Sequence, residues 1–395
     1  MGLNFSMSLW VIVQILMGYN LVLPVLIFLV YLFVPKPKKK EKISDISDYA
    51  IIVTAYEETH TLGPVVASIL KSTYKNYLIY IVADNCDITD LKFDDERVVL
   101  LKPEETLSSN IGSHFYAINR FKRAHNRITI IDSDNLVDPE YLAELNVYFD
   151  SSFSAVQGLR SAKNMDTVYS CLDAARDIYY HYYDGKILFG VGSSAMLAGS
   201  GMAFTTSLYK ECLEHLVITG AGFDKILQKK IVELGYRIAF AEKAIVYDEK
   251  TSRSDQLVKQ RARWINTWFR YFKFGFKLVS KGITQFNWNQ FLFGLVLLRP
   301  PLFIFLLISV LFMFVDIIIS PVQALIWLIG FIIFIMGFLF ALLMSDTDKR
   351  IYQSLWGIPK FIFFQVLSLL KVHKANEISI ATQHYHDEEI FDLKK

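Results

Sequence analysis

The chain has 395 residues, of which 53% are hydrophobic and 20% are charged, and its formal net charge at pH 7 is +2. Soluble domains average about 45–50% apolar and about 25% charged residues, so the apolar excess indicates membrane segments. A nearly neutral chain has no broad basic field to hold a phosphate backbone, which excludes nucleic acid as a partner. At about 100–200 residues per domain, the length allows one large or two modest domains.

An apolar run occupies residues 9–34, which is longer than the roughly 20 residues that cross the hydrocarbon core of a bilayer. The basic residues follow this run, whereas those of a secretory signal precede its apolar part. The positive-inside rule then places residues 36–42 in the cytoplasm. We therefore expect residues 1–35 to form an N-terminal transmembrane helix and residues 36–48 to form a basic cytoplasmic linker.

Residues 49–278 have a different character, because short apolar runs alternate there with helical patterns. This alternation is typical of βαβ units and of a mostly parallel sheet. The candidate strands are residues 49–54, 78–83, 98–101 and 127–131, and the candidate helices are residues 63–72 and 109–124. We predict a cytoplasmic α/β domain with a mixed sheet that is Rossmann-like in its first half.

A second apolar block begins at Phe291 and is interrupted by an Arg-Pro-Pro sequence that starts at Arg299. The part before the interruption is too short to span, so residues 279–299 are expected to form an interfacial helix. The apolar runs that follow predict a hairpin of two transmembrane helices within residues 300–345. Asp316 lies near the outer end of one span, and we interpret it as a boundary carboxylate, with a functional intramembrane charge as the alternative.

The last apolar segment, residues 351–370, contains a proline, a lysine and a glutamine. An interfacial amphipathic helix within residues 346–371 is therefore favoured over a fourth span. Three spans bring the charged cytoplasmic tail, residues 372–395, to the same side as residues 36–42, in agreement with the positive-inside rule. We expect a multi-pass protein of the cell membrane whose catalytic domain faces the cytoplasm.

Three of the four candidate strands end in acidic clusters. Strand 127–131 runs directly into Asp132, Ser133 and Asp134. In open α/β sheets, ligands bind just beyond the carboxyl ends of the strands. Two carboxylates separated by one residue can present one group to a ribose and the other to a hard cation that bridges phosphates. Helix capping before Pro139 is the alternative explanation for this pair.

The other two clusters are Asp84 with its neighbours, and Ala55, Tyr56 and Glu58. Turn chemistry explains one such cluster, because Asp and Asn favour turns, but three clusters on the same sheet edge predict a polar crevice. A nucleotide pocket is the preferred interpretation.

Two further groups lie downstream. Asp224 is near the start of a helical stretch, where a carboxylate is favourable and an ordinary helix cap is the alternative. The sequence Gln-Arg-Ala-Arg-Trp from Gln260 to Trp264 lies on a helix just before the second apolar block. Arg263 could stabilise a diphosphate and Trp264 could stack on a sugar, whereas such a group beside a membrane is also typical of an interfacial belt.

The order and spacing of these groups resemble the signature of the membrane-bound family 2 glycosyltransferases. This inverting group includes the cellulose, chitin and hyaluronan synthases, and its signature is Asp, Asp-x-Asp, Asp and Gln-x-x-Arg-Trp. The residues that match it are Asp84, Asp132, Asp134, Asp224, Gln260, Arg263 and Trp264. The resemblance covers about residues 49–270.

The resemblance implies a GT-A type fold and a divalent cation, Mg²⁺ or Mn²⁺, bound by Asp134. It also implies that Asp224 is the general base, which takes a proton from the acceptor hydroxyl as the anomeric configuration inverts. The positions that it assigns to the nucleotide sugar are Ala55, Tyr56, Glu58, Asp84, Asp132, Ser133, Gln260 and Arg263. The positions that it assigns to the acceptor are Gly199, Ser200, Gly201 and Trp264.

The chain departs from the family pattern at three places. Phe223 stands where the family usually has Glu before the base, Glu57 replaces an Asn, and residues 113–119 replace a Lys-Gly stretch. The leading hypothesis is an active transferase that takes a nucleotide sugar, expected to be a UDP-sugar, and a glycan or lipid-linked acceptor. Processive polysaccharide synthesis and single transfer both fit, and a homo-oligomer could supply further walls for a polymer pore. The alternative is a catalytically inactive membrane scaffold that retains the fold.

Overall fold

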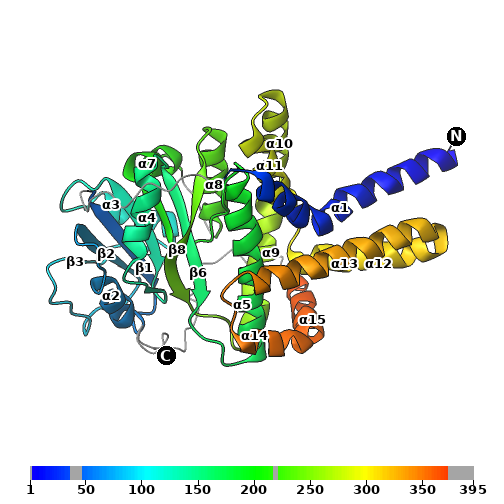
Figure 1. Ribbon diagram of the computed structural model, residues 1–395. Helices are drawn as coiled ribbons and strands as arrows, with labels where there is room; N and C mark the ends of the chain where they lie inside the picture. The colour runs from blue at the N-terminus through cyan, green and yellow to red at the C-terminus, as the bar shows by residue number, and fades with distance from the viewer. Residues whose placement is uncertain (1, 36–46, 217–220, 372–395) are drawn as a thin grey trace.

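The computed structural model describes residues 2–35, 47–216 and 221–371, and three apolar helices project from one side of an α/β domain (Figure 1). These helices are α1 (Gly2–Phe33), α12 (Leu302–Ile319) and α13 (Pro321–Leu343). Each is long and apolar enough to cross a membrane. The predicted apolar helix near the N-terminus and the predicted pair near the C-terminus are therefore confirmed as helices.

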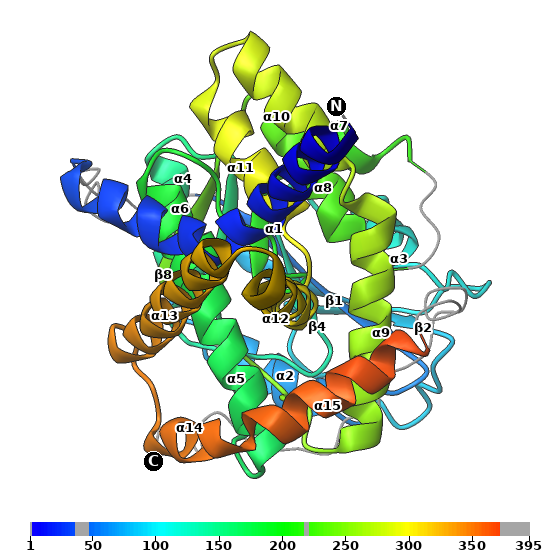
Figure 2. The same ribbon diagram turned by 90° about the vertical axis from the view of Figure 1, so that its right-hand side faces the viewer.

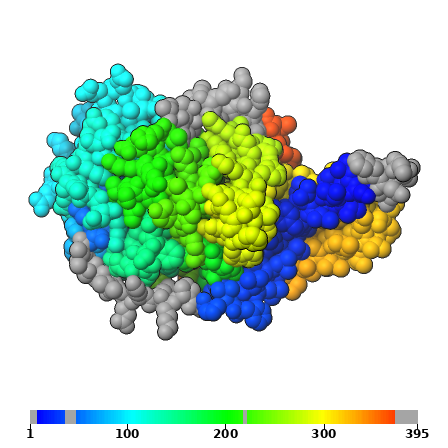
Figure 3. Space-filling view, turned by 90° about the horizontal axis from the view of Figure 1, so that it is seen from above, coloured from blue at the N-terminus to red at the C-terminus, as the bar shows by residue number. Residues whose placement is uncertain are grey.

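The helices α1 and α13 pack closely along their lengths, and Figure 3 shows α1 beside the α12–α13 pair. A Cβ atom at Gly337 would lie 2.7 Å from Cγ2 of Val25, and one at Gly330 would lie 3.2 Å from Cδ1 of Leu21. Small residues let apolar helices approach each other in this way.

A buried polar cluster joins the same three helices. Asp316 on α12 is fully buried and accepts hydrogen bonds from the indole N–H groups of Trp10 (3.0 Å) and Trp327 (3.2 Å) and from the amide of Gln14 (3.3 Å). The Gln14 amide also donates to Gln323 at 3.1 Å. Asp316 is thus an acceptor between helices in the last turn of α12.

The domain is built on one eight-stranded sheet in the order β3-β2-β1-β4-β7-β6-β8-β5. Its strands are β1 (Tyr49–Tyr56), β2 (Tyr77–Asp84), β3 (Val98–Leu101), β4 (Arg127–Asp132), β5 (Leu136–Val137), β6 (Ala155–Ala162), β7 (Met202–Thr205) and β8 (Ile238–Asp248). The strands β1 to β4 pair in parallel, β6 pairs in parallel with β8, and β7 and β5 run antiparallel to their partners. The sheet is mixed, as predicted, and all four candidate strands are present.

The helices of the first half are α2 (Leu62–Leu70), α3 (Asn110–Ile118) and α4 (Tyr141–Asp150). The helix expected over residues 109–124 ends at Ile118, so that prediction was too long. The backbone N–H of Lys122 donates to the hydroxyl of Tyr80 on β2 at 2.9 Å, which turns the chain back toward the sheet. The helical pattern of the sequence does not predict this long-range hydrogen bond.

The second half contributes α5 (Val168–Tyr180), a π-helix η1 (His181–Ile187), α6 (Leu188–Gly190), α7 (Thr206–Leu213), α8 (Phe223–Glu233) and α9 (Ser254–Tyr271). The π-helix meets the apolar helices. The hydroxyl of Tyr183 donates to the carbonyl of Gly337 on α13 at 2.9 Å, and the buried carboxylate of Asp184 pairs with Arg299, just ahead of α12. These contacts attach the α/β domain to the apolar helices.

The segment expected as one interfacial helix, residues 279–299, instead holds the end of α10 (Phe274–Thr284) and all of α11 (Trp288–Leu298). The two helices form a hairpin because Asn287 caps α11, its side chain accepting from the N–H of Gln290 at 3.0 Å. Glycines permit close contact: a Cβ atom at Gly282 would lie 2.5 Å from the backbone nitrogen of Phe291.

Residues 346–371, expected as one amphipathic helix, form α14 (Lys349–Ser354), a 3₁₀ turn η2 (Leu355–Gly357) and α15 (Ile358–Leu369). Figure 2 shows α15 extending from α14 past α5 to α9, and α15 packs on both. The expected tail, residues 372–395, and most of the expected linker lie outside the described residues.

Candidate active site

The acidic strand ends lie together because β2, β1 and β4 are parallel neighbours. In the register of the sheet, Tyr56 pairs with Asp84, and Thr54 pairs with Asp132. The chain order changes direction between β1 and β4, which is the topological switch point where open α/β sheets bind ligands. The polar sheet edge expected from the sequence is therefore formed by these three strands.

Asp84 organises the loop that faces this edge. It is 2% exposed, and its two carboxylate oxygens accept hydrogen bonds from the backbone N–H groups of Leu107 and Ser108, both at 2.8 Å. The Ser108 hydroxyl is 3.3 Å from the hydroxyl of Tyr56. Asp84 therefore sets the position of the loop beside Tyr56, a role that the sequence pattern did not indicate.

Glu57 and Glu58 follow directly after the carboxyl end of β1. Glu57 has a positive φ of 64° and accepts a hydrogen bond from the side chain of Asn85, 3.3 Å away, so it joins the ends of β1 and β2. An oxygen of the Glu58 carboxylate is 3.7 Å from Nδ1 of His60.

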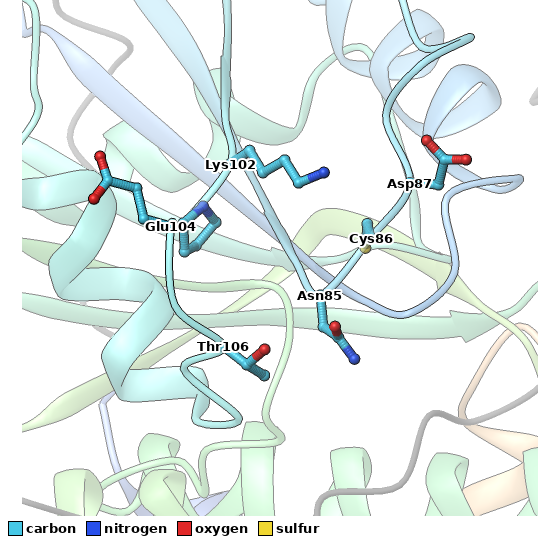
Figure 4. Close-up of a pocket in the computed structure, with 7 residues that line it drawn as sticks. Asn85, Cys86, Asp87, Lys102, Glu104 and Thr106 are labelled. Carbon is cyan, nitrogen blue, oxygen red and sulfur yellow. The ribbon is translucent and has the colours of Figure 1, made fainter.

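An open cavity of about 370 Å³ adjoins Asp84 at the ends of β2 and β3 (Figure 4). Its lining residues are Asn85, Cys86, Asp87, Lys102, Pro103, Glu104 and Thr106. In Figure 4 the side chain of Lys102 extends toward the loop that carries Cys86 and Asp87, and that of Glu104 points away from it. Burial raises the pKa of the Cys86 thiol to about 11, so it is a neutral wall of the cavity. Lys102 was missed by sequence reasoning, and its signal is a cation directly after a strand of this sheet.

The Asp132–Asp134 loop is tied to the glycine turn at residues 199–201. The backbone N–H of Asp132 donates to the hydroxyl of Ser200 (3.1 Å), which itself donates to the side chain of Asn135 (2.5 Å). The Asn135 amide in turn donates to the carboxylate of Asp134 at 3.0 Å. Two groups that are far apart in sequence are thus connected by hydrogen bonds.

Gly201 makes that connection sterically feasible. Its φ is +65°, and a Cβ atom there would lie 2.8 Å from a methyl group of Val246 on β8. Its backbone N–H donates to the carbonyl of Ile130 on β4 at 2.9 Å, so the turn is pressed onto the strand that carries Asp132.

The donor set at Asp134 suits a hard divalent ion shared with a ligand. Mg²⁺ is usually held by one or two carboxylates and substrate phosphates, not by an all-protein cage. The carboxylate of Asp134 is 8% exposed and oriented by Asn135. Among the described residues, no group of three or more His, Cys, Asp or Glu side chains is arranged to hold a metal ion. Asp134, two residues after Asp132, is therefore the residue that would hold a divalent ion here, and the ion would neutralise charge on a phosphate ligand.

Asp224 lies in the first turn of α8. The next residue, Lys225, connects it to the segment just before the glycine turn at residues 199–201. An ammonium–carboxylate distance of 3.0 Å pairs Lys225 with Asp224, and Lys225 also donates to the carbonyl of Leu197 at 3.3 Å. The side chain of Asp224 is 15% exposed, so it is accessible to a small group. The segment from Leu197 to Gly201 thus lies between Asp224 and the Asp132–Asp134 loop.

The helix α9 packs against the start of α8 at Gly222. This glycine has a φ of +101°, and a Cβ atom there would lie 2.6 Å from the ring of Tyr271 and 2.8 Å from the methyl group of Thr267. The carboxyl end of α9, at Thr267 and Tyr271, is therefore held next to Gly222, two residues before Asp224, by a position that only glycine fills without strain.

The residues of the Gln-Arg-Ala-Arg-Trp sequence point in different directions. Gln260 accepts a hydrogen bond from the hydroxyl of Thr251 at 3.1 Å. Arg263 is half-buried, and this burial lowers the pKa of its guanidinium from the usual value. Trp264 is 40% exposed, whereas Arg261 is buried and pairs with Asp173 on α5. Sequence reasoning did not single out Arg261, although its spacing of three residues places it beside Trp264 on the helix.

The mixed sheet and its topology have the GT-A glycosyltransferase fold. Residues 47–267, more than half of the chain, match the family described as Glycosyltransferase like family 2, and the chain belongs to this family.

A solved structure agrees with the fold. The mannosyltransferase PcManGT from Pyrobaculum calidifontis, in complex with GDP-Man and Mn²⁺, is 14% identical with a TM-score of 0.58, covering 92% of this chain and 97% of its own. Two structures of S. aureus TarS, one with UDP-GlcNAc, have a TM-score of 0.37, too low to carry an argument. They are 15% and 14% identical and cover 54% and 52% of this chain and 39% and 59% of their own. No curated protein matches the sequence.

Proposed function

We propose that this protein is a membrane-bound, inverting glycosyltransferase that transfers a sugar from a nucleotide sugar to a glycan or lipid-linked acceptor. The observation that carries the proposal is the continuous set of contacts from Asp134 through Asn135 and Ser200 to the 197–201 segment, and from there through Lys225 to Asp224. In this proposal, the residue that would hold the cation and the base lie on the two sides of one short turn.

The proposed reaction follows from these positions. Asp224 accepts the proton of the acceptor hydroxyl, whose oxygen forms a bond to the anomeric carbon. The bond from that carbon to the diphosphate oxygen breaks on the opposite face, and its electron pair leaves with the nucleoside diphosphate. The half-buried cation of Arg263 stabilises the charge on this leaving group. A divalent ion at Asp134, when bound, neutralises charge on the diphosphate.

The remaining roles concern binding. Ala55, Tyr56, Glu58 and the loop held by Asp84 are proposed to enclose the nucleoside, with Asp132 and Ser133 beside the ribose. Gln260 and Trp264 frame the donor and acceptor ends, and Gly199, Ser200 and Gly201 let the backbone approach the acceptor. We propose a UDP-sugar as donor. Because PcManGT is seen with GDP-Man and Mn²⁺, GDP-mannose belongs in the same screen.

The proposed location is the cell membrane, with α1, α12 and α13 as spans and the α/β domain in the cytoplasm. The three helices support this by length and composition. The basic residues 36–42 after the first helix and Lys349 and Arg350 after the third support the orientation, because cytoplasmic flanks carry an excess of Lys and Arg.

The decisive variant is Asp224→Asn in the full-length protein in lipid nanodiscs. We expect turnover of nucleotide sugars to fall by roughly 10³-fold, within the range for loss of a general base. Calorimetric binding of the nucleotide with Mn²⁺ should persist. The matched control is Asp150→Asn, because Asp150 also pairs with a basic residue, Arg127, but lies at the end of α4, beside the amino end of β4. Unchanged turnover in Asp224→Asn would reject the assigned base.

The competing proposal is an inactive scaffold, motivated by Phe223 before the base and by the missing Lys-Gly stretch. Calorimetry decides between the two. A scaffold that has lost its site binds neither UDP-glucose nor GDP-mannose in the presence of Mn²⁺, whereas the transferase binds its donor and releases it when EDTA removes the ion.

A further inference from the structure

The indole of Trp264 lies against two guanidinium groups. The Cζ atom of Arg261, one helical turn earlier on α9, is 4.1 Å from the ring centroid, and that of Arg176 on α5 is 4.2 Å from it. Guanidinium groups stack favourably on aromatic faces, and Trp is the best partner. The orientation of the half-exposed indole therefore depends on two cations, one of which belongs to another helix.

One buried carboxylate holds both arginines. The same oxygen of Asp173 is 3.1 Å from Nη2 of Arg176 and accepts a hydrogen bond from Nη2 of Arg261. The side chains of Asp173 and Arg261 are each 3% exposed. Within the part of the chain that the structure describes, Nε and Nη1 of Arg261 have no hydrogen-bond partner. Asp173 and the indole are thus the groups that orient this guanidinium.

Arg176, the second arginine, is connected to the sheet by a series of ion pairs. Arg176 also pairs with Asp177, whose other oxygen is 2.5 Å from the ammonium of Lys250. That ammonium is 2.6 Å from the carboxylate of Asp248, the last residue of β8. Burial opposes the ionisation of Asp177, but Arg176 and Lys250 hold its pKa well below the usual value. A row of acidic and basic side chains, each paired with the next, therefore runs from the end of the sheet to the arginines at Trp264.

We propose that Asp173, through Arg176 and Arg261, is a positioning residue that fixes the indole of Trp264 and thereby sets the affinity for the acceptor. The inference rests on the proposed function, in which Trp264 contacts the acceptor. Buried charges that are paired with good geometry hold their neighbours in one arrangement, and removing one partner leaves the others uncompensated. Arg263, which we assign to the donor diphosphate, is two positions from Arg261 and does not share its helix face.

The proposal predicts a change in acceptor binding without a comparable change in donor binding. Arg176→Lys keeps the charge and removes the planar fork that stacks on the indole. With UDP-glucose as donor and octyl glucoside as acceptor in nanodiscs, we expect the acceptor KM to rise by about tenfold and the donor KM to change by less than about twofold. Asp173→Asn, which removes the shared charge, should shift the acceptor KM in the same direction.

The matched control is Arg127→Lys. Arg127 is also buried, pairs with one carboxylate, Asp150 at 3.2 Å, and stacks on an aromatic ring, with its Cζ atom 4.6 Å from the centroid of Phe149. It lies at the amino end of β4, away from the carboxyl edge that carries Asp132. Arg127→Lys should lower thermal stability as Arg176→Lys does, and it should leave the acceptor KM unchanged.

A readout without substrate tests the positioning directly. Acrylamide quenching of tryptophan fluorescence is measured for the protein and for each variant, with and without an added Trp264→Phe change, so that the difference isolates Trp264. We expect the Trp264 component to be quenched more strongly in Arg176→Lys and to stay the same in Arg127→Lys.

The outcomes are distinguishable. Identical quenching of Trp264 in the parent and in Arg176→Lys would overturn the positioning role whatever the activity. Altered quenching with an unchanged acceptor KM would overturn the link to the acceptor. An absence of turnover in the parent protein would count against the proposed function, while the quenching result would still decide the role of Asp173.

Discussion

The imidazole of His114 packs against the phenyl ring of Phe223, with ring centroids 5.2 Å apart and ring planes at 69°. His114 belongs to the segment that replaces the Lys-Gly stretch of the family, and Phe223 replaces the Glu before the base. Nδ1 of His114 is 2.7 Å from the hydroxyl of Tyr209, so the ring is held in place. The two departures, which look independent in the sequence, form one contact between uncharged aromatic rings. This packing holds Phe223, the residue next to Asp224, in place.

The first prediction concerns stability in acid. Burial lowers the pKa of His114 from 6.5 to about 3, so between these values the unfolded chain binds a proton that the folded protein does not. The contribution of the neutral His114 ring to the free energy of unfolding is therefore fully present above pH 6.5. It is lost as the pH falls toward 3, by about 1.4 kcal/mol per pH unit. In His114→Gln this contribution disappears, so urea unfolding at pH 7, 6 and 5 should show a shallower loss than in the parent.

The control for this prediction is His215→Gln, because His215 is exposed and solvated in both states. It should follow the parent at every pH. A parallel acid dependence of His114→Gln and the parent would show that the His114 ring takes up its proton in the folded state.

The second prediction tests the contact between α8 and α9. Gly222→Ala and Gly235→Ala both place a side chain at positive φ, +101° and +91°, which costs about 1 kcal/mol or more. Only Gly222→Ala also drives a methyl group into Tyr271 and Thr267, since nothing lies within 4 Å of a Cβ atom at Gly235. We expect similar losses of thermal stability from backbone strain, with a further loss for Gly222→Ala.

Turnover should separate the two glycine variants. Displacing α9 moves Arg263 and Trp264 relative to Asp224, and a displacement of about 1 Å can cost roughly 100-fold in rate. Gly222→Ala should therefore lose far more turnover than Gly235→Ala. Equal turnover in the two variants would mean that α9 does not need its present distance from α8.

The third prediction concerns Lys225, which pairs with Asp224 and donates to the carbonyl of Leu197. Lys225→Met removes the link between the proposed base and the turn before Gly199, and we expect kcat to fall by about tenfold. Steady-state kinetics with the donor found in the nucleotide-sugar screen measures this. Lys229→Met, on the same helix and paired with Glu233, is the matched control and should leave kcat unchanged.

The fourth prediction concerns the polar cluster of the apolar helices. Asp316→Leu leaves the donors of Trp10, Gln14 and Trp327 without their shared acceptor, and we expect a loss of about 2 kcal/mol in the stability of the helix bundle. Ser309→Ala is the control on the same helix, because its buried hydroxyl has no hydrogen-bond partner within the described residues. Thermal unfolding in nanodiscs should be lowered by the first change and not by the second.

Local patterns in the sequence predicted the elements well. Strands β1 to β4 and the three apolar helices follow from the period of apolar residues and from run length, which are properties of adjacent positions. The acids at the strand ends could also be placed on one edge, because the carboxyl ends of parallel strands meet there. The strands β5 to β8 and the split of residues 279–299 into two helices were not predicted, because they depend on pairing and capping that run length does not reveal.

The sequence by itself thus determined the α/β class, the apolar helices and the order of the acidic and Arg-Trp motifs, since hydrophobic period and motif spacing act over a few residues. Only the tertiary structure decided which side chains meet. Asp173 and Arg261 are 88 positions apart, and the pairs Asp316 with Trp10 and His114 with Phe223 are also distant in sequence. Such contacts form when the folded chain packs distant groups together and removes water from them. The residues next to each group in the sequence carry no pattern that indicates its partner.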